Sequence, residues 1–148
     1  MPVYHVASHC RYYIKYHIVW IVKYRKELLV TDSVVKRLIE LLHTIGESYE
    51  LRVEEIGADG DHLHLFCWGL PKISPARTVE IFKSISAREL MKEFPQLRLK
   101  TYGAGLWGVG YYLATVGYHT NEEAVRAYVR NQGKNKDVGQ YTQLKIFI

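Results

Sequence analysis

Two histidines, His62 and His64, stand two residues apart in a largely apolar stretch of the chain. Side chains alternate between the two faces of a β-strand, so this spacing puts both imidazoles side by side on one face. The residues between and after them then point the other way, toward a core: Leu63, Leu65 and Cys67. Neutral imidazoles are good ligands for divalent metal ions. The pair therefore indicates a metal site that still lacks a third ligand.

A second pair of candidate residues, Tyr128 and Gln132, lies four residues apart in a segment expected to be helical. That spacing places both side chains on one helix face, about one turn apart. The amide oxygen of Gln132 can then be the third ligand, with the phenol beside the open coordination positions. A metal ion with open positions polarises a phosphoryl oxygen, and tyrosine can form a covalent intermediate. The four residues together predict phosphodiester cleavage by tyrosine attack.

The rest of the chain supplies strands and helices that can position these groups. Segments rich in β-branched and aromatic residues predict four strands: residues 12–23, 51–56, 61–68 and 111–116. Apolar residues at helical spacing, with capping residues before them, predict three helices: about 32–47, 75–94 and 120–132. This order matches an α+β fold, the ferredoxin-like or RRM-like split βαβ pattern with a four-stranded antiparallel sheet. The last helix, which carries Tyr128, is an addition to that pattern.

The connections give further expectations. Residues 57–60, Gly-Ala-Asp-Gly, have the composition of a turn before the histidine strand. Residues 1–10 show no regular period and are expected to form a loose or partner-bound arm. Residues 97–110 contain several glycines and are expected to be an irregular connection. Thr120 with Glu123 predicts a capping box for the last helix, and Gly133 its end.

The composition fits one soluble domain of 148 residues, with 48% hydrophobic and 24% charged residues. No apolar run reaches the roughly 18 residues of a membrane helix, so no membrane partner is expected. The first ten residues lack the pattern of a signal peptide. The two cysteines, Cys10 and Cys67, do not indicate a disulfide framework, and a reducing cytoplasm fits.

The net charge of +5 is distributed unevenly along the chain. Basic residues outnumber acidic ones by five to one in residues 1–30 and by seven to three in residues 72–100. Such blocks suit contact with a phosphate backbone, and the many aromatic residues offer stacking surfaces for unpaired bases. A solvated surface is the equally open alternative for each charge. Candidate DNA contacts in these blocks are Lys23, Arg25, Lys83 and Arg88.

With these motifs in place, the chain resembles the single-tyrosine HUH transposases of the smallest bacterial and archaeal insertion sequences, the IS200-like transposases. The matching segments are residues 16–20 with 23–25, 61–65, 83–88 leading to 94–95, 105–111, and 128–132. They occur in the expected order over roughly residues 8–133. Many relatives have a serine after the Leu-Trp pair, where this chain has Gly108.

The resemblance implies roles for the candidate residues. His62, His64 and Gln132 are expected to hold a divalent metal ion, Mg²⁺ with Mn²⁺ able to substitute. Tyr128 is expected to attack single-stranded DNA, leaving a covalent 5′-phosphotyrosine intermediate and a free 3′-hydroxyl. The bond energy is kept in that link, so a 3′-hydroxyl can attack it and rejoin strands, and no nucleotide cofactor is expected.

The resemblance also implies partners and organisation. The chain is expected to be a single HUH transposase domain, with its core at residues 8–133 and a tail at 134–148. Family members act as homodimers with composite active sites, in which the tyrosine helix of one subunit completes the histidine pair of the other. The expected substrates are single-stranded DNA hairpins near the ends of the insertion sequence.

Other functions stay open from the sequence. A related single-strand nicking or repeat-processing HUH endonuclease would use the same residues. A non-enzymatic RRM-like module would bind single-stranded nucleic acid through aromatic side chains, with structural histidines and with Tyr128 in a core. The role of His17, expected on the same sheet face as the pair, is also open.

Overall fold

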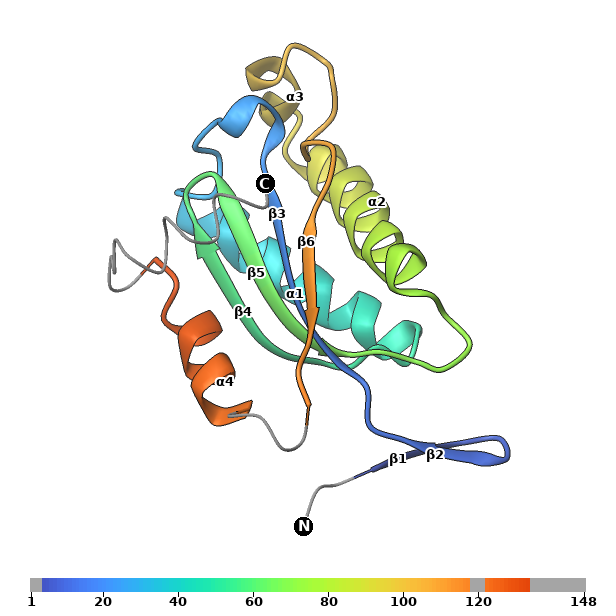
Figure 1. The fold of residues 1–148 in the computed structure, drawn as a ribbon. Helices are drawn as coiled ribbons and strands as arrows, with labels where there is room; N and C mark the ends of the chain where they lie inside the picture. The colour runs from blue at the N-terminus through green and yellow to red at the C-terminus, as the bar shows by residue number, and fades with distance from the viewer. Residues whose placement is uncertain (1–3, 118–121, 134–148) are drawn as a thin grey trace.

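The computed structural model of the protein describes residues 4–117 and 122–133. Its centre is a four-stranded sheet in the order β4-β5-β3-β6 (Figure 1). The strands are β3 (Lys15–Ile21), β4 (Val53–Asp59), β5 (His62–Trp68) and β6 (Tyr112–Thr115), and every pairing is antiparallel. The two central strands are the first and third of the four along the chain, as in the split βαβ pattern. The predicted α+β fold class is confirmed.

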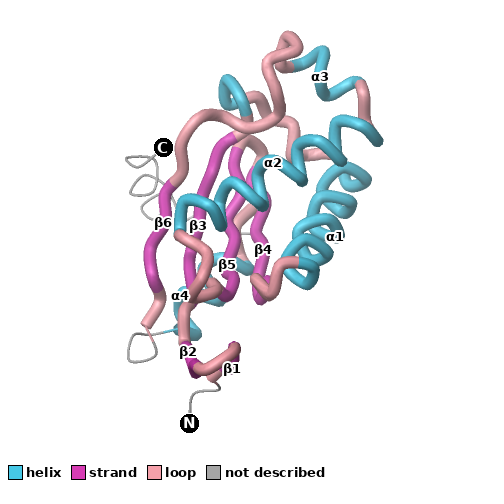
Figure 2. Tube along the Cα trace, turned by 90° about the vertical axis from the view of Figure 1, so that its right-hand side faces the viewer, coloured by secondary structure: helices cyan, strands magenta, loops and turns pink. Residues whose placement is uncertain are grey.

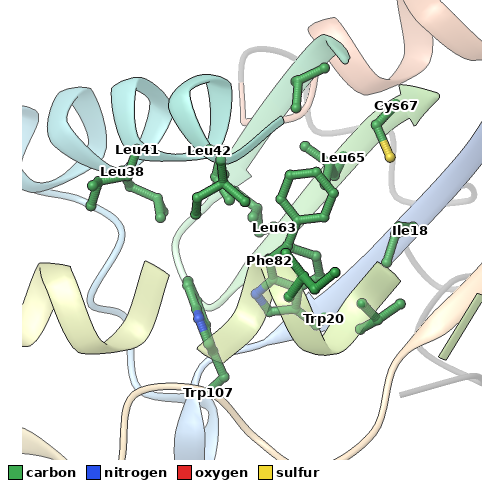
Figure 3. Packing of buried hydrophobic residues seen from close by; sticks show 14 of the residues in the cluster. Ile18, Trp20, Leu38, Leu41, Leu42, Leu63, Leu65, Cys67, Phe82 and Trp107 are labelled. Atoms are coloured by element: carbon green, nitrogen blue, oxygen red, sulfur yellow. The ribbon is translucent and has the colours of Figure 1, made fainter. Parts of the chain in front are cut away.

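Helices α1 (Asp32–Ser48) and α2 (Pro75–Glu93) lie together on one face of the sheet (Figure 2). The main core lies between them and the sheet (Figure 3), and its most deeply buried side chains include Ile18, Trp20, Leu38, Leu42, Leu63, Leu65 and Phe82. Fully burying one such side chain contributes roughly 1.5–3 kcal/mol. This face is therefore the main source of the fold's stability.

Helix α2 begins and ends where the sequence predicts. The Ser74 hydroxyl accepts a hydrogen bond from the Arg77 backbone N–H at 3.0 Å, and Pro75 occupies the first turn. The helix ends at Glu93, and its C-cap residue, Phe94, directly precedes Pro95. The connection after it was expected to be irregular, but a short helix, α3 (Gln96–Lys100), occupies its start because Leu97 turns inward and is buried.

The turn predicted at residues 57–60 is wrong in its position. Gly57, Ala58 and Asp59 continue strand β4 and pair with residues of β5. Only Gly60 has the positive φ of a tight turn, at +63°. The strand runs on because Ala58 packs against the main core, while Gly57 leaves room for a helix on the other face.

The N-terminal region also departs from expectation. Residues 12–23 were predicted as one strand and residues 1–10 as a loose arm. Instead β1 (His5–Ala7) and β2 (Cys10–Tyr12) form a separate antiparallel hairpin, which leaves the sheet in Figure 1. The His5 ring stacks on Trp68 with ring centroids 3.6 Å apart, which ties the hairpin to strand β5. After β3 the chain makes a short 3₁₀ turn, η1 (Lys23–Arg25).

Helix α4 (Glu122–Arg130) packs against β4 and β5 on the face opposite α1 and α2. It ends at Arg130, two residues earlier than expected, and a turn leads to Gly133, which has the expected positive φ of +84°. The predicted cap residue Thr120 lies outside the described residues. No helix within residues 4–117 and 122–133 is long and apolar enough to cross a membrane.

Candidate active site

Strand β5 presents the two histidines to the α4 side of the sheet, as the alternation predicts. Their ring centroids are 5.4 Å apart, and both side chains are almost fully buried, at 2% exposure for His62 and 0% for His64. The antiparallel register places Gly57 of β4 beside His64, with Val19 of β3 on its other side. The intervening leucines enter the main core.

His64 is held by a third histidine, His17 of β3. The Nδ1 atom of His64 lies 3.3 Å from Nε2 of His17. Burial lowers the pKa of His17 to about 4, and burial with the two neighbouring histidines keeps the pKa of His64 well below its usual range. Both rings are therefore neutral at pH 7. Nε2 of His64 is buried and has no hydrogen-bond partner among the described residues, so its lone pair can bind a metal ion.

His62 is oriented by carboxylates on either side of it. Its Nδ1 lies 2.5 Å from Oδ1 of Asp61, and its Nε2 lies 3.9 Å from Oδ2 of Asp59. The other oxygen of Asp61 pairs with Nε of Arg25 at 3.3 Å. A carboxylate on one ring nitrogen fixes the tautomer and orientation of a metal-binding histidine, so the Asp61 contact suits the predicted role.

Tyr128 extends from α4 toward the same histidines. Its ring centroid lies 5.6 Å from that of His64 and 5.9 Å from that of His17, with the ring nearly perpendicular to both. Its phenolic oxygen is buried. The fold thus brings together the predicted nucleophile and metal ligand within one chain. Exchange of the tyrosine helix between subunits stays a prediction.

Gln132, one turn after Tyr128, lies over the neighbouring strand. A Cβ atom added to Gly57 would lie 2.8 Å from Cβ of Gln132, so the two residues are in close contact. The Gln132 amide nitrogen donates to the Tyr128 carbonyl oxygen at 3.2 Å, and its oxygen is the end that suits a hard cation. No three histidine, cysteine or acidic side chains gather to hold a metal in the described part of the chain. The predicted site takes its third ligand from another class of side chain, this amide.

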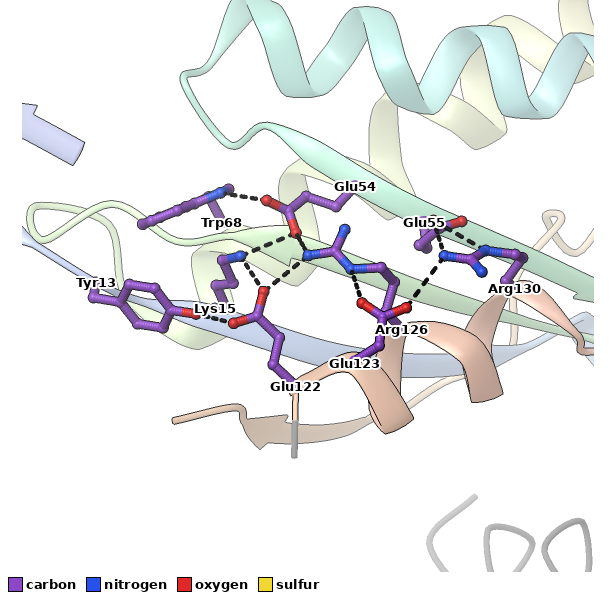
Figure 4. Close-up of polar contacts among 9 residues, drawn as sticks. All are labelled: Tyr13, Lys15, Glu54, Glu55, Trp68, Glu122, Glu123, Arg126 and Arg130. Atoms are coloured by element: carbon purple, nitrogen blue, oxygen red, sulfur yellow. Dashed lines mark hydrogen bonds and ion pairs between the residues drawn. The ribbon is translucent and has the colours of Figure 1, made fainter. Parts of the chain in front are cut away.

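An ion network fixes α4 to the sheet (Figure 4). We call this the anchor network; its members are Lys15, Glu54, Glu122 and Arg126. Nζ of Lys15, only 6% exposed, lies 3.0 Å from Glu54 and 2.5 Å from Glu122. The Arg126 guanidinium lies 2.7 Å from Glu54 and 2.8 Å from Glu122. Burial is the largest single influence and opposes ionisation of both carboxyls. The hydrogen bonds from Lys15 and from Trp68 or Tyr13, with the charges of Lys15 and Arg126, together outweigh it and lower the pKa of each carboxyl.

Further contacts extend the anchor network at both ends. Tyr13 donates a hydrogen bond to Glu122, and Nε1 of Trp68 donates to Glu54 at 2.8 Å. One turn further along α4, Arg130 pairs with Glu55 at 3.1 Å. These residues were not among the candidates that the sequence indicates. Only the spacing of Glu122 and Arg126, four apart on one helix face, could have signalled part of the set.

The four predicted DNA contacts have different local surroundings. Nζ of Lys83 donates to the carbonyl oxygens of Gly108 and Gly110, at 2.7 and 3.0 Å, so it holds the loop beside α2. Arg88 is exposed and pairs with Glu89 at 3.4 Å. Lys23 and Arg25 lie together on η1, next to the His62 end of the site.

Known proteins resemble this chain over most of its length. A family model described as "Transposase IS200 like" matches residues 10–132. The chain is 32% identical over 121 residues to the ISDra2 transposase TnpA of Deinococcus radiodurans, covering 82% of this chain and 85% of that protein. It is 28% identical over 134 residues to the transposase for insertion sequence element IS200 of Salmonella typhimurium, covering 90% and 86%.

Solved structures show the same fold. A crystal structure from Deinococcus radiodurans, provisionally described as a transposase, matches with a TM-score of 0.66 and 30% identity, covering 82% of this chain and 92% of that one. A REP-associated tyrosine transposase bound to a REP hairpin matches with a TM-score of 0.53, covering 84% and 70%. At 12% identity the second likeness concerns the fold alone. The family match and the identity to TnpA confirm the resemblance, and the chain belongs to the IS200-like transposase family, a family of DNA-processing enzymes.

Proposed function

We propose that this protein cleaves and rejoins single-stranded DNA at the ends of an insertion sequence, with Tyr128 as the nucleophile. The observation that carries the proposal is the position of Tyr128. Its ring centroid lies 5.6 Å from the imidazole centroid of His64. In the first step, the Tyr128 oxygen loses its proton and bonds to phosphorus, while the bond from phosphorus to the 3′-oxygen breaks. The departing 3′-oxygen takes up a proton, and the 5′ end stays attached to the enzyme.

The second step reverses the first with another strand end. A 3′-hydroxyl attacks the phosphotyrosine, the bond from phosphorus to the Tyr128 oxygen breaks, and the phenol recovers its proton. The energy of the phosphodiester is kept in the covalent link, so the reaction needs no nucleotide cofactor. Residues about 8–133 form the catalytic unit in this proposal.

The ligand set proposed for a divalent ion, Mg²⁺ or Mn²⁺, is His62, His64 and Gln132. The buried Nε2 of His64, which lacks a described partner, supports that fit. When bound, the ion would supply Lewis-acid polarisation of a phosphoryl oxygen. His17 contacts Nδ1 of His64 and Asp61 contacts Nδ1 of His62, so each imidazole is held on the side away from its Nε2 atom. The anchor network holds the helix that bears Tyr128.

The proposed substrate is a DNA hairpin with a single-stranded flank, cut by a homodimer with composite active sites. The REP-associated tyrosine transposase of the same fold was solved with a REP hairpin. The net charge of +5, together with Lys23 and Arg25 at the His62 end, suits a phosphate backbone.

The deciding experiment incubates the protein with hairpin-bearing single-stranded DNA and Mg²⁺, then separates the products on a denaturing gel. We expect a covalent protein–DNA adduct that Tyr128→Phe abolishes. Tyr112→Phe is the matched control, because that ring also lies close to His17, at 5.8 Å, and the adduct should persist. Cleavage without an adduct would indicate a metal-dependent hydrolase. Binding without cleavage, with any divalent ion, would indicate a binding module.

A further inference from the structure

Two exposed tyrosines meet at the end of the molecule that carries α3. Tyr24 lies in η1 and Tyr102 follows α3, and their ring centroids are 6.0 Å apart with the rings tilted by 56°. The two segments are held together, since the Lys23 N–H donates to the Leu106 carbonyl oxygen at 2.8 Å. In Figure 1 the turn after β3 and the region of α3 lie at the same end of the molecule.

Neither ring belongs to a core. Tyr24 is 57% exposed and Tyr102 is 77% exposed. Both residues adopt a left-handed backbone, with φ of +60° and +56°. Residues with a bulky side chain rarely take that conformation, which glycine adopts easily. The fold therefore holds two large aromatic side chains outward at positions where the backbone favours glycine. Packing does not explain the choice of tyrosine at either position.

Positive charge surrounds the two rings. Nζ of Lys26 lies 5.4 Å from the centroid of the Tyr102 ring, and Nζ of Lys23 lies 5.7 Å from that of Tyr24. Residues 23–27 and 98–102 hold five basic side chains and one acidic side chain, Glu27. A hollow of about 410 Å³ beside Tyr102 is lined by Lys26, Glu27, Leu28, Leu99, Lys100 and Tyr102. Exposed aromatic rings among cations are the usual means of binding unpaired bases and their phosphates.

This surface adjoins the candidate active site. Arg25, next to Tyr24 in the chain, pairs with Asp61 at 3.3 Å, and Asp61 contacts His62 at 2.5 Å. A DNA strand with a phosphate at the histidine pair can therefore reach this surface from the His62 end of the site. The charge of the surface matches the phosphate groups of that strand.

We propose that Tyr24 and Tyr102 form a stacking platform for an unpaired base of the DNA strand beside the cleavage site, with Lys23 and Lys26 contacting its phosphates. The platform rests on the proposed function for the identity of its substrate. It adds a base-binding surface, distinct from the metal ligands and from Tyr128.

Binding can be measured by fluorescence anisotropy in the Tyr128→Phe background, without metal, so that no cleavage occurs. The probes are a labelled DNA hairpin with a six-thymidine single-stranded extension and the same hairpin with a blunt end. Tyr24→Ala and Tyr102→Ala should each weaken binding of the extended hairpin by about tenfold, within the range seen for loss of one base–aromatic stack. The blunt hairpin should bind as before, and Tyr24→Phe and Tyr102→Phe should retain affinity. Lys26→Ala should lower the salt dependence of binding by roughly one counterion.

Tyr49→Ala is the matched control, because Tyr49 is exposed but lies at the end of α1. As a second readout, 5-iododeoxyuridine in the extension should crosslink to Tyr24 or Tyr102 on irradiation. The inference is overturned if both alanine variants keep the parental affinity, or if they lose affinity for the blunt hairpin equally. It is also overturned if the parent binds neither probe. Adduct formation is scored separately: weakened binding without any adduct contradicts only the proposed function, and a normal adduct with unchanged binding contradicts only the platform.

Discussion

The two faces of the sheet differ in what they bury. Toward α1 and α2, the strands present an apolar layer that includes Trp20, Leu63 and Leu65. Toward α4, the same strands bury Lys15, His17 and His64, all less than 9% exposed. The apolar cluster on this side is small, with Phe66, Val116 and Val129 buried and Val125 and Tyr128 packed against them.

The face toward α1 and α2 therefore mainly stabilises the fold, and the face toward α4 carries the candidate active site. Apolar burial is the dominant favourable term in folding, and the α1–α2 face supplies most of it. Buried polar groups cost free energy unless they are paired, so the α4 face adds less stability for the same loss of exposure. Changes on one face should therefore affect folding, and changes on the other should affect the reaction.

The sharpest test replaces His64, which faces α4. His64→Ala should abolish adduct formation, because it removes a proposed metal ligand whose ring centroid lies 5.6 Å from that of Tyr128. DNA binding should stay close to parental, since the phosphate contacts come from elsewhere. The denaturing-gel assay and anisotropy measure the two effects. Equal loss of binding and adduct would show that the histidine strand is structural, and the contrast between the faces would fail.

The neighbouring residue, Leu65, tests the other face of the same strand. Leu65→Ala should lower the free energy of unfolding by roughly 2–5 kcal/mol, because it leaves a cavity in the main core. Urea denaturation followed by circular dichroism measures this. At temperatures where the variant is folded, adduct formation should approach the parental rate. A large loss of activity in fully folded Leu65→Ala would mean that the two faces are not independent.

A weaker effect is expected for His17, which touches no substrate in this proposal and acts by positioning His64. His17→Ala should reduce Mn²⁺ affinity by about 10- to 100-fold, the usual cost of losing the partner of a metal-binding histidine. Titration calorimetry measures the affinity, and a thermal melt confirms that the variant is folded. His43→Ala, an exposed histidine on α1, should leave the affinity unchanged. Unchanged affinity in His17→Ala would assign His17 to packing alone.

The smallest expected effect is a weaker docking of α4 at low pH. Glu54 and Glu122 have pKa values below their ordinary value of 4.5 in the folded chain, so their contribution is complete above pH 4.5 and is lost as the pH falls through the lowered values. Amides of α4 should then exchange faster relative to those of α1, after correction for the intrinsic effect of pH. Hydrogen exchange read by mass spectrometry measures this. Glu122→Gln should reduce the pH dependence, whereas parallel loss of protection in α1 and α4 would contradict separate docking of α4.

Features of the fold and the site that depend on neighbouring residues could be predicted from the sequence, and contacts between residues far apart in the sequence could not. Local patterns predicted the alternation of His62 and Leu63 and the cap at Ser74, because strand pleat and helix ends are set by neighbours. The His17–His64 contact joins residues 47 positions apart, and Lys15 and Glu122 are 107 apart. Such pairs depend on register and on where α4 docks, which no local pattern encodes. The prediction of a turn at residues 57–60 was wrong for the same reason, because its first glycine, Gly57, makes room for α4, which lies far away in the sequence.

That glycine, Gly57, affects where the phenolic oxygen of Tyr128 lies. A Cβ atom there would lie 2.1 Å from the carbonyl oxygen of Val129, so the helix rests directly on the main chain of the strand. The height of Tyr128 above the sheet is therefore set at this position by contact between two backbones. Even one added methyl group at this position would push the helix, and with it the proposed nucleophile Tyr128, away from the histidines.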